Sequence, residues 1–201
     1  MRHRPTTVFF CLATILAALG AAHDRAFAQE TAPESDSRAL ISEAADLASA
    51  GKSVEALDKA EAAYFSIWDL APLAFRRVEL IDGGEQSYET VVPRADNIYA
   101  AGQEIAVYVD PVGFGWREQG EEWETDLSAD FILATTEGRI IAGQKNFGEF
   151  QIRTQRRTRD SFLVLNYQFS GVPAGDYVLT TTVNDRIDEE TASFELPVVI
   201  R

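Results

Sequence analysis

One stretch of the sequence, residues 108–126, combines large aromatic side chains with glycines and carboxylates. Aromatic rings on a glycine-rich loop are costly to expose unless they stack on a sugar ring or fill a pocket in a partner protein. The same rings can instead fold back onto the edge of a sheet or onto neighbouring helices. The stretch therefore predicts a ligand-binding or partner-binding loop, with a buried hairpin as the alternative. Its candidate binding residues are Tyr108, Phe114, Trp116 and Trp123.

Four arginines lie close together in residues 153–159, in a chain whose formal net charge is −14. Guanidinium groups bind phosphates and carboxylates through paired hydrogen bonds. The cluster can therefore dock an acidic envelope polymer or an acidic partner protein. The alternative is a solvated loop that pairs with the protein's own acids. From this cluster we take Arg153, Arg156 and Arg157 as candidate binding residues, with Arg159 beside them.

Carboxylates are so frequent in this sequence that their presence does not indicate catalysis. A hydrolytic pair can be drawn from several acids, but a chain with 32 Asp and Glu residues contains such pairs by chance. The acidic turn around 184–190 lacks the Asp-x-Asp-x-Asp pattern of a calcium loop, which favours an ordinary polar turn. We therefore predict no catalytic residue, no metal site and no cofactor. The acids considered for a hydrolytic pair are Asp110, Glu118, Glu122 and Asp126.

The N-terminal residues have the three parts of a secretory signal peptide. Arg2 and Arg4 precede an apolar run over residues 8–22, and residues 26–28 read Ala-Phe-Ala. A basic start, a short apolar centre and an Ala-x-Ala end are typical of an exported precursor. The run holds about 15 residues, short of the roughly 20 that span a bilayer as a helix. We expect cleavage after Ala28 and a periplasmic or secreted protein with no transmembrane segment after cleavage.

Cleavage at that point removes the only Cys, Cys11, and both His, His3 and His23. A chain without Cys or His has no thiolate nucleophile, no histidine base and no zinc or haem ligands of the common kinds. Its strong negative charge repels nucleic acid. The sequence therefore predicts a protein that is not an enzyme and does not bind nucleic acid. An unidentified envelope protein or glycan is the expected partner.

Residues 37–71 carry the pattern of a helical hairpin. Apolar residues recur at three- and four-residue spacing on both sides of Gly51, and glycine commonly ends helices. Ser37 and Ser53 are candidate caps for the first and the second helix. The preceding residues 29–36 are polar and acidic, which favours a disordered leader.

This hairpin resembles a single tetratricopeptide-like unit, in which small residues let two helices approach closely. One such unit cannot bury its own faces, because roughly three must stack to be stable. The hairpin can pack its apolar face on the rest of the protein, and the sequence leaves open whether it docks on the sandwich or swings free on the segment 68–72. Peptide binding by tetratricopeptide arrays uses several units, so the resemblance does not imply that function. The matching residues are Leu40, Ala44, Leu47, Gly51, Ala56, Ala60 and Ala63.

After residue 72 the helical period gives way to short runs with apolar residues at every second position, separated by turn residues. That alternation is typical of a half-buried antiparallel sheet. We predict a β-sandwich domain over 72–201, preceded by the helical hairpin over 37–71. The predicted strands lie near 73–81, 86–92, 104–110, 127–136, 139–143, 147–154, 160–169, 176–184 and 191–200.

Residues 173–179 read Pro-Ala-Gly-Asp-Tyr-Val-Leu and resemble the entry to the penultimate strand of bacterial immunoglobulin-like domains. The resemblance implies a mainly β fold, an immunoglobulin-like antiparallel β-sandwich with an N-terminal α-helical hairpin. The order of export signal, helical hairpin and sandwich also resembles secreted Gram-negative proteins of no assigned function. That resemblance implies architecture and location rather than activity.

Three functional hypotheses are open at the level of the sequence. The first is a non-catalytic periplasmic or secreted protein-interaction or envelope-structural module. The second is a carbohydrate- or small-ligand-binding β-sandwich that uses the aromatic loop 108–126, with Trp116 and Trp123 stacking on the ligand. The third is a carboxylate hydrolase. Of these we predict the first.

Overall fold

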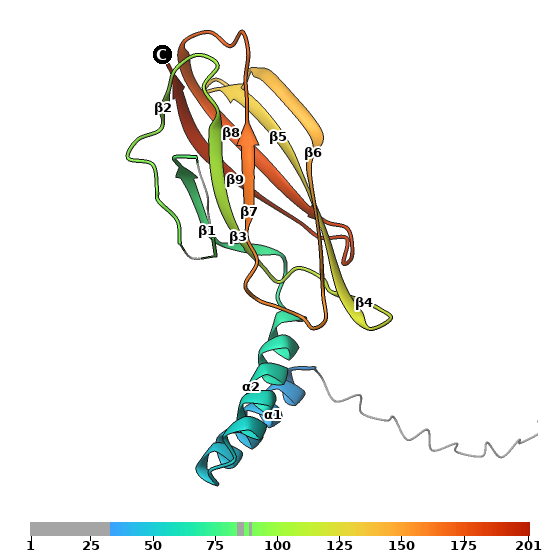
Figure 1. Cartoon of the computed structure of the whole chain (residues 1–201). Helices are drawn as coiled ribbons and strands as arrows, with labels where there is room; N and C mark the ends of the chain where they lie inside the picture. Colours follow the sequence, from blue (N-terminus) through green and yellow to red (C-terminus); the bar gives the residue numbers. More distant parts are fainter. Residues whose placement is uncertain (1–32, 84–86, 89) are drawn as a thin grey trace, which may run out of the picture. The chain divides into compact units, whose positions relative to one another are not determined.

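Two helices precede the strands in the computed structural model, which describes residues 33–83, 87–88 and 90–201 (Figure 1). The predicted signal peptide, residues 1–28, lies outside the described residues. The described helices and sheets belong to one compact unit. Neither of these helices is long and apolar enough to cross a membrane.

The helical hairpin consists of α1 (Pro33–Ser49) and α2 (Ser53–Trp68). A turn at Gly51 joins them, and the φ of 74° at this glycine confirms its predicted role at the helix end. The first helix begins before Ser37, so the expected cap is wrong and the end of the expected disordered leader is helical. Proline is favoured at a first helical position, because its missing N–H would have no partner there.

Small side chains allow α1 and α2 to approach each other. Of the three alanines on α2 that match the tetratricopeptide-like pattern, Ala56 and Ala63 are buried, whereas Ala60 is exposed. The hydroxyl groups of Ser37 on α1 and Ser66 on α2 share a hydrogen bond of 2.7 Å. Ser53 is the first residue of α2 and not its cap, because the cap position falls one residue earlier.

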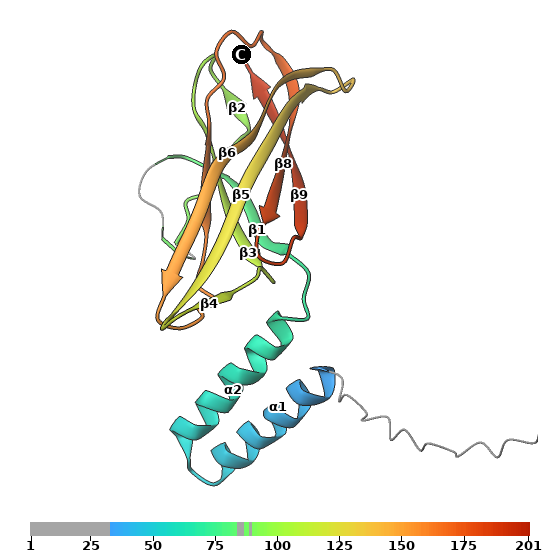
Figure 2. The ribbon, with the colours of Figure 1, turned by 90° about the vertical axis from the view of Figure 1, so that its right-hand side faces the viewer.

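The strands form two sheets, seen from two sides in Figures 1 and 2. The smaller sheet has the order β1-β3-β7, and the larger has the order β2-β9-β8-β5, with β6 and the short β4 also paired to β5. Neighbouring strands are antiparallel, apart from the parallel pair β2 and β9. The predicted mainly β, immunoglobulin-like sandwich with an N-terminal helical hairpin is thereby confirmed. The strands are β1 (Ala74–Ile81), β2 (Ile98–Tyr99), β3 (Ile105–Val112), β4 (Arg117–Gln119), β5 (Glu122–Thr135), β6 (Ile140–Thr154), β7 (Leu163–Tyr167), β8 (Gly175–Asp185) and β9 (Thr191–Ile200).

Some predicted strands differ from the observed ones. The runs near 139–143 and 147–154 are a single strand, β6, which bulges around Asn146, a residue with a φ of 50°. Because a bulge breaks the alternation of side chains, the sequence reads as two strands. The prediction near 86–92 is wrong in its described part, where Ser87 and Thr90 form only an isolated bridge. The strands β2 and β4, two and three residues long, have no sequence signal.

The core of the sandwich is built from the inward positions of the strands. Along β8, the side chains of Tyr177, Leu179, Thr181 and Val183 are buried, which confirms the predicted alternation. The hydroxyl of Tyr167 on β7 shares a hydrogen bond of 2.7 Å with the hydroxyl of Thr181 on β8. Burial raises the pKa of Tyr167 well above its usual range, so the phenol stays neutral and links the two sheets.

Candidate protein-docking groove

The last residue of α2, Trp68, enters the hydrophobic core of the sandwich and is only 5% exposed. Its indole ring meets the ring of Phe114 edge-on, with the ring centroids 4.9 Å apart. The indole Nε1 donates a hydrogen bond of 2.7 Å to the backbone carbonyl of Phe114. Trp116 packs against Phe114 in turn, at 5.6 Å between centroids. The aromatic segment thus folds back onto the helical hairpin, which is the alternative that the sequence left open.

The acidic turn between β8 and β9 supports the same junction. Asp185, which is buried, accepts a hydrogen bond of 2.5 Å from the backbone N–H of Gly115. Glu190 accepts one of 2.6 Å from the backbone N–H of Leu73, just after the hairpin. Burial, followed by the charges of Asp185 and Glu190, raises the pKa of Asp188. The acids of this turn therefore bind backbone amides of the segments that enter the junction.

Arg157 ties the loop between β6 and β7 to α2. Its guanidinium makes a two-pronged ion pair with Asp69, one contact being 3.0 Å from Nη1 to Oδ2. The same group lies 4.4 Å from the ring centroid of Phe65 on α2 and 5.7 Å from that of Trp123 on β5. Arg157 of the predicted arginine cluster thus contacts both Trp123 of the predicted aromatic loop and Phe65 of the helix.

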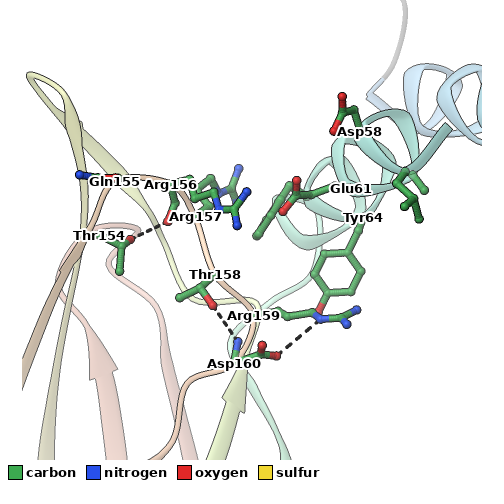
Figure 3. A pocket seen from close by; sticks show the side chains of 13 residues that line it. Asp58, Glu61, Tyr64, Thr154, Gln155, Arg156, Arg157, Thr158, Arg159 and Asp160 are labelled. Carbon is green, nitrogen blue, oxygen red and sulfur yellow. Dashed lines mark hydrogen bonds and ion pairs between the residues drawn. The ribbon is translucent and has the colours of Figure 1, made fainter. Parts of the chain in front are cut away.

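A groove of about 930 Å³ separates α2 from residues 154–160 of this loop (Figure 3). We call it the α2 groove. Leu57, Tyr64 and Phe65 give it an apolar side on the helix. Loop residues, among them three arginines, form the other side. The α2 groove thus has an apolar side on the helix and a polar side on the loop.

The two sides of the α2 groove carry opposite charges. Asp58 and Glu61 project from α2, and Arg156 lies on the loop across from Glu61 (Figure 3). Among the described residues these three side chains form no ion pair with one another, whereas Arg159 pairs with Asp160 at 3.5 Å. A charged group that makes no internal pair can be matched by a partner without breaking an existing contact.

Two of the predicted binding residues lie away from this groove. Tyr108 is fully buried in a separate small cluster, stacked on Phe162 at 5.4 Å with the guanidinium of Arg77 at 5.7 Å. Arg153 lies on β6 and contacts Glu124 on the larger sheet. The structure therefore brings Phe114, Trp116, Trp123, Arg156 and Arg157 to the junction and the groove, but not Tyr108 or Arg153.

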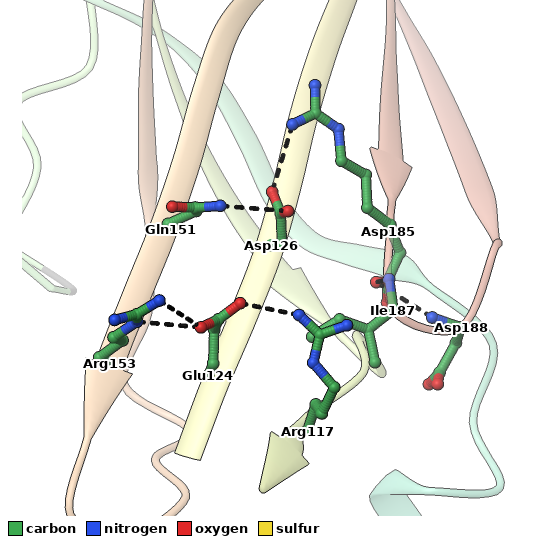
Figure 4. A network of polar contacts seen from close by, with 9 residues as sticks. Arg117, Glu124, Asp126, Gln151, Arg153, Asp185, Ile187 and Asp188 are labelled. Atoms are coloured by element: carbon green, nitrogen blue, oxygen red, sulfur yellow. Dashed lines mark hydrogen bonds and ion pairs between the residues drawn. The ribbon is translucent and has the colours of Figure 1, made fainter. Parts of the chain in front are cut away.

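Glu124 is the centre of a polar network on the larger sheet (Figure 4). The side chain of Glu124 is only 5% exposed. One of its carboxylate oxygens pairs with Arg117 at 2.9 Å, and the other pairs with Arg153 at 2.8 Å. Nearby, Asp126 accepts hydrogen bonds from Gln151 and Arg186. The network links β4, β5 and β6 and the turn after β8, so its charges stabilise the sheet.

Sequence reasoning missed the helical side of the groove. The sequence pattern singles out no binding role for Leu57, Asp58 or Glu61. A signal was present, because the apolar residues 54, 57, 64, 65 and 68 share one face of a helix with 3.6 residues per turn. That face lies opposite Ala56 and Ala63. Two apolar faces on one helix indicate two packing partners.

Comparisons with known proteins identify no family, since no family model and no curated protein matches this chain. Among solved structures, the C-terminal domain of wzt matches with 10% identity over 65% of this chain and 74% of that one, at a TM-score of 0.38. Spo0M, a sporulation control protein from Bacillus subtilis, is 11% identical over 65% of this chain and 50% of its own, at 0.34. The CARDB domain of the PF1109 protein from Pyrococcus furiosus, in complex with di-metal ions, is 10% identical over 65% and 93%, at 0.25. At these scores the likenesses carry no argument about function.

Proposed function

We propose that this protein is a non-catalytic interaction module of the periplasm or the secreted fraction, and that it binds a partner protein in the α2 groove. One observation carries the proposal. The apolar face of α2 that packs on the sandwich through Phe65 and Trp68 continues into solvent at Leu57 and Val54, which are 71% and 73% exposed. An apolar helix face that extends beyond its internal packing partner supports a docking role.

The chemistry of the groove favours a protein over a glycan as the partner. Sugar rings bind by stacking on exposed aromatic faces. The aromatic residues that line the α2 groove are Tyr64 and Phe65, and their ring centroids lie 5.6 Å and 4.4 Å from the guanidinium groups of Arg159 and Arg157. The exposed apolar surface is instead aliphatic, at Val54 and Leu57, and aliphatic side chains pack against other aliphatic side chains.

The absence of catalysis is part of the proposal and rests on the residue types around the groove. Its carboxylates Asp58 and Glu61 sit on the surface of a helix, and the third, Asp160, pairs with Arg159. No histidine or cysteine lies among the residues that line it. The proposed location rests on the signal-like pattern of residues 1–28.

Photo-crosslinking tests the proposed docking site directly. A photoreactive amino acid replaces Leu57 in one variant and Ile140 in another, since Ile140 is similarly exposed, at 65%, but lies on β6. Irradiation of producing cells is expected to join the position-57 variant to one defined protein and to give no such adduct at position 140. Adding Val54→Asp to the first variant is expected to remove the adduct.

Equal adducts at both positions, or none at position 57, would contradict the proposal. A further check uses the captured protein in a binding titration. We expect Leu57→Asp to weaken its binding at least about tenfold, or about 1.4 kcal/mol, because the change buries a charge against an apolar partner surface. Ile140→Asp is expected to leave the affinity unchanged. Both variants are expected to unfold at the wild-type denaturant midpoint, since both positions are exposed.

A further inference from the structure

The outer face of α2 has the spacing of a helix-packing surface. Val54, Leu57, Tyr64 and Phe65 are spaced so that they lie on one face of a helix with 3.6 residues per turn. The opposite face, with Ala56 and its neighbours, already packs in the hairpin. A second helix can lay its own ridge along Val54 and Leu57 in the way that helices pack in bundles.

An extended peptide segment of a partner would form fewer hydrogen bonds in the α2 groove than at the edge of a sheet. Strand addition depends on unpaired backbone groups at the edge of a sheet. The main wall of the α2 groove is a helix, and the backbone N–H and C=O groups inside a helix bond to one another. Only side chains are offered to the partner along α2, and a helix-in-groove contact is the recognition mode that needs only side chains.

Charge argues against a second copy of this chain as the occupant. If α2 packed on α2 of another copy, Asp58 and Glu61 would meet their own counterparts, and like charges in contact oppose association. A partner with basic side chains beside its apolar ridge would instead match these acids. On the loop side, Arg156 would match an acidic side chain.

We infer that the α2 groove binds one amphipathic helix of a partner protein, with basic residues toward Asp58 and Glu61 and an acidic residue toward Arg156. This inference rests on the proposed function and names the partner's structure and charge. The helix of about 16 residues that α2 can accompany would be about 24 Å long, at 1.5 Å per residue.

Selection from a random peptide library tests the inference without requiring that the partner be identified first. Peptides about as long as α2 are displayed and selected on the immobilised protein, purified from cells that express the whole chain. Peptides retained equally by Leu57→Asp are discarded. The remaining sequences are expected to be amphipathic at helical spacing, rich in Lys and Arg, and helical by circular dichroism when bound.

Charge reversal supplies the matched comparison. Asp58→Lys combined with Glu61→Lys is expected to bind the selected peptides at least about tenfold more weakly and to select acidic peptides in their place. Arg156→Glu is expected to weaken the binding of peptides that carry an acidic edge. Ile140→Asp is expected to leave the binding of the selected peptides unchanged. Enrichment of alternating or proline-rich sequences, no enrichment at all, or selection that ignores the charge reversal would overturn the inference.

The two proposals fail separately. If the photo-adduct at position 57 forms but the selection yields extended peptides or none, the protein docks a partner there and the inferred helix is wrong. If the position-57 variant instead joins only to a second copy of this chain, the inference of a basic partner is also wrong. If no adduct forms, the proposed function itself fails.

Discussion

At the scale of single residues, Trp68 connects the helical hairpin to the sandwich. Its ring packs edge-on against Phe114, and its Nε1–H donates to the carbonyl of the same residue. A buried tryptophan normally gives its N–H to a partner, and here that partner belongs to the segment that the sequence suggested for ligand binding. One side chain therefore determines where α2 ends relative to the sheets.

Replacing Trp68 is expected to destabilise the protein. Trp68→Ala should lower the free energy of unfolding by about 3–5 kcal/mol, since it removes a large buried ring and leaves a cavity. Trp68→Phe keeps a ring but loses the hydrogen bond, and should lower it by about 1–3 kcal/mol. Urea unfolding measures both. A Trp68→Ala protein as stable as the wild type would show that the helix end is not held by this residue.

The pH dependence of stability is expected to report on Asp188. Burial and the nearby carboxylates of Asp185, Glu190 and Asp69 raise its pKa, and Arg157 opposes the shift. A raised pKa means that the folded state holds this proton more tightly than the unfolded chain. The contribution is therefore fully present below the ordinary value of 3.8 and is lost as the pH rises through the raised pKa.

Asp188→Asn tests this sign. The variant should have a higher free energy of unfolding than the wild type at pH 7, where the wild-type carboxylate is ionised. The difference should shrink as the pH falls toward the ordinary pKa of an aspartate, because both side chains are then neutral. Urea unfolding across this range measures the difference. A variant that is less stable at pH 7, or a gain that is independent of pH, would contradict the assignment.

At the scale of elements, the connection between β3 and β4 must pass close to the connection between α2 and β1. Gly113 has a φ of 74°, and a Cβ there would lie 2.7 Å from the carbonyl oxygen of Ala71 and closer still to that of Pro72. Only glycine satisfies both the left-handed backbone and the contact. The close approach allows Phe114 to reach Trp68.

Substitutions of two glycines separate the cost of the left-handed backbone from the cost of the close contact. Gly113→Ala is expected to lower the free energy of unfolding by several kcal/mol, because backbone atoms must move to admit the methyl group. Gly120 has a similar φ of 67°, but a Cβ there would have nothing within 4 Å. Gly120→Ala should therefore lower the free energy of unfolding by only about 1–2 kcal/mol. Chemical unfolding of the two proteins side by side measures the difference. Equal losses would show that the approach of the two connections is not tight.

The elements themselves could be predicted where the local pattern is regular. The alternation of apolar residues along β8 and β9 was sufficient to predict both strands, and the glycine between the helices was sufficient to predict the turn. Each of these signals lies within one short stretch of sequence. The bulge around Asn146 in β6 and the short strand β4 were not visible, since both depend on pairing with β5. The predicted start of α1 is too late, because Ser37 was taken as the helix cap and the proline at which the helix begins was not taken as a start signal.

The candidate site could be predicted only in part, for the same reason. Arg156 and Arg157 were recognised because charge clusters are visible in one dimension. The opposite wall on α2 lies about 100 residues earlier in the sequence, and nothing local places it beside residues 154–160. The aromatic loop was recognised as unusual, but its residue types are equally suited to binding a ligand and to holding a helix. The division into domains at residue 72 stays a prediction.

At the scale of the molecule, the helical hairpin and the sandwich together form a surface that neither has alone. The sandwich supplies the loop with Arg156, and the hairpin supplies Leu57 and its neighbours. Contacts made by Trp68, Arg157 and the acidic turn hold the hairpin and the sandwich together. The groove is therefore a consequence of docking, and changes that loosen the junction are expected to weaken partner binding as well as stability.

Reversible blocking of the groove tests the central claim most directly. The only cysteine of the chain is Cys11, and the expected cleavage after Ala28 would remove it, so Leu57→Cys is expected to supply the only thiol. A bulky group attached there through a disulfide should abolish retention of the crosslinked partner, and reduction should restore it. The same group on Ile140→Cys should leave retention unchanged. Retention by the protein blocked at position 57, or equal loss from both, would show that the partner does not bind in the α2 groove.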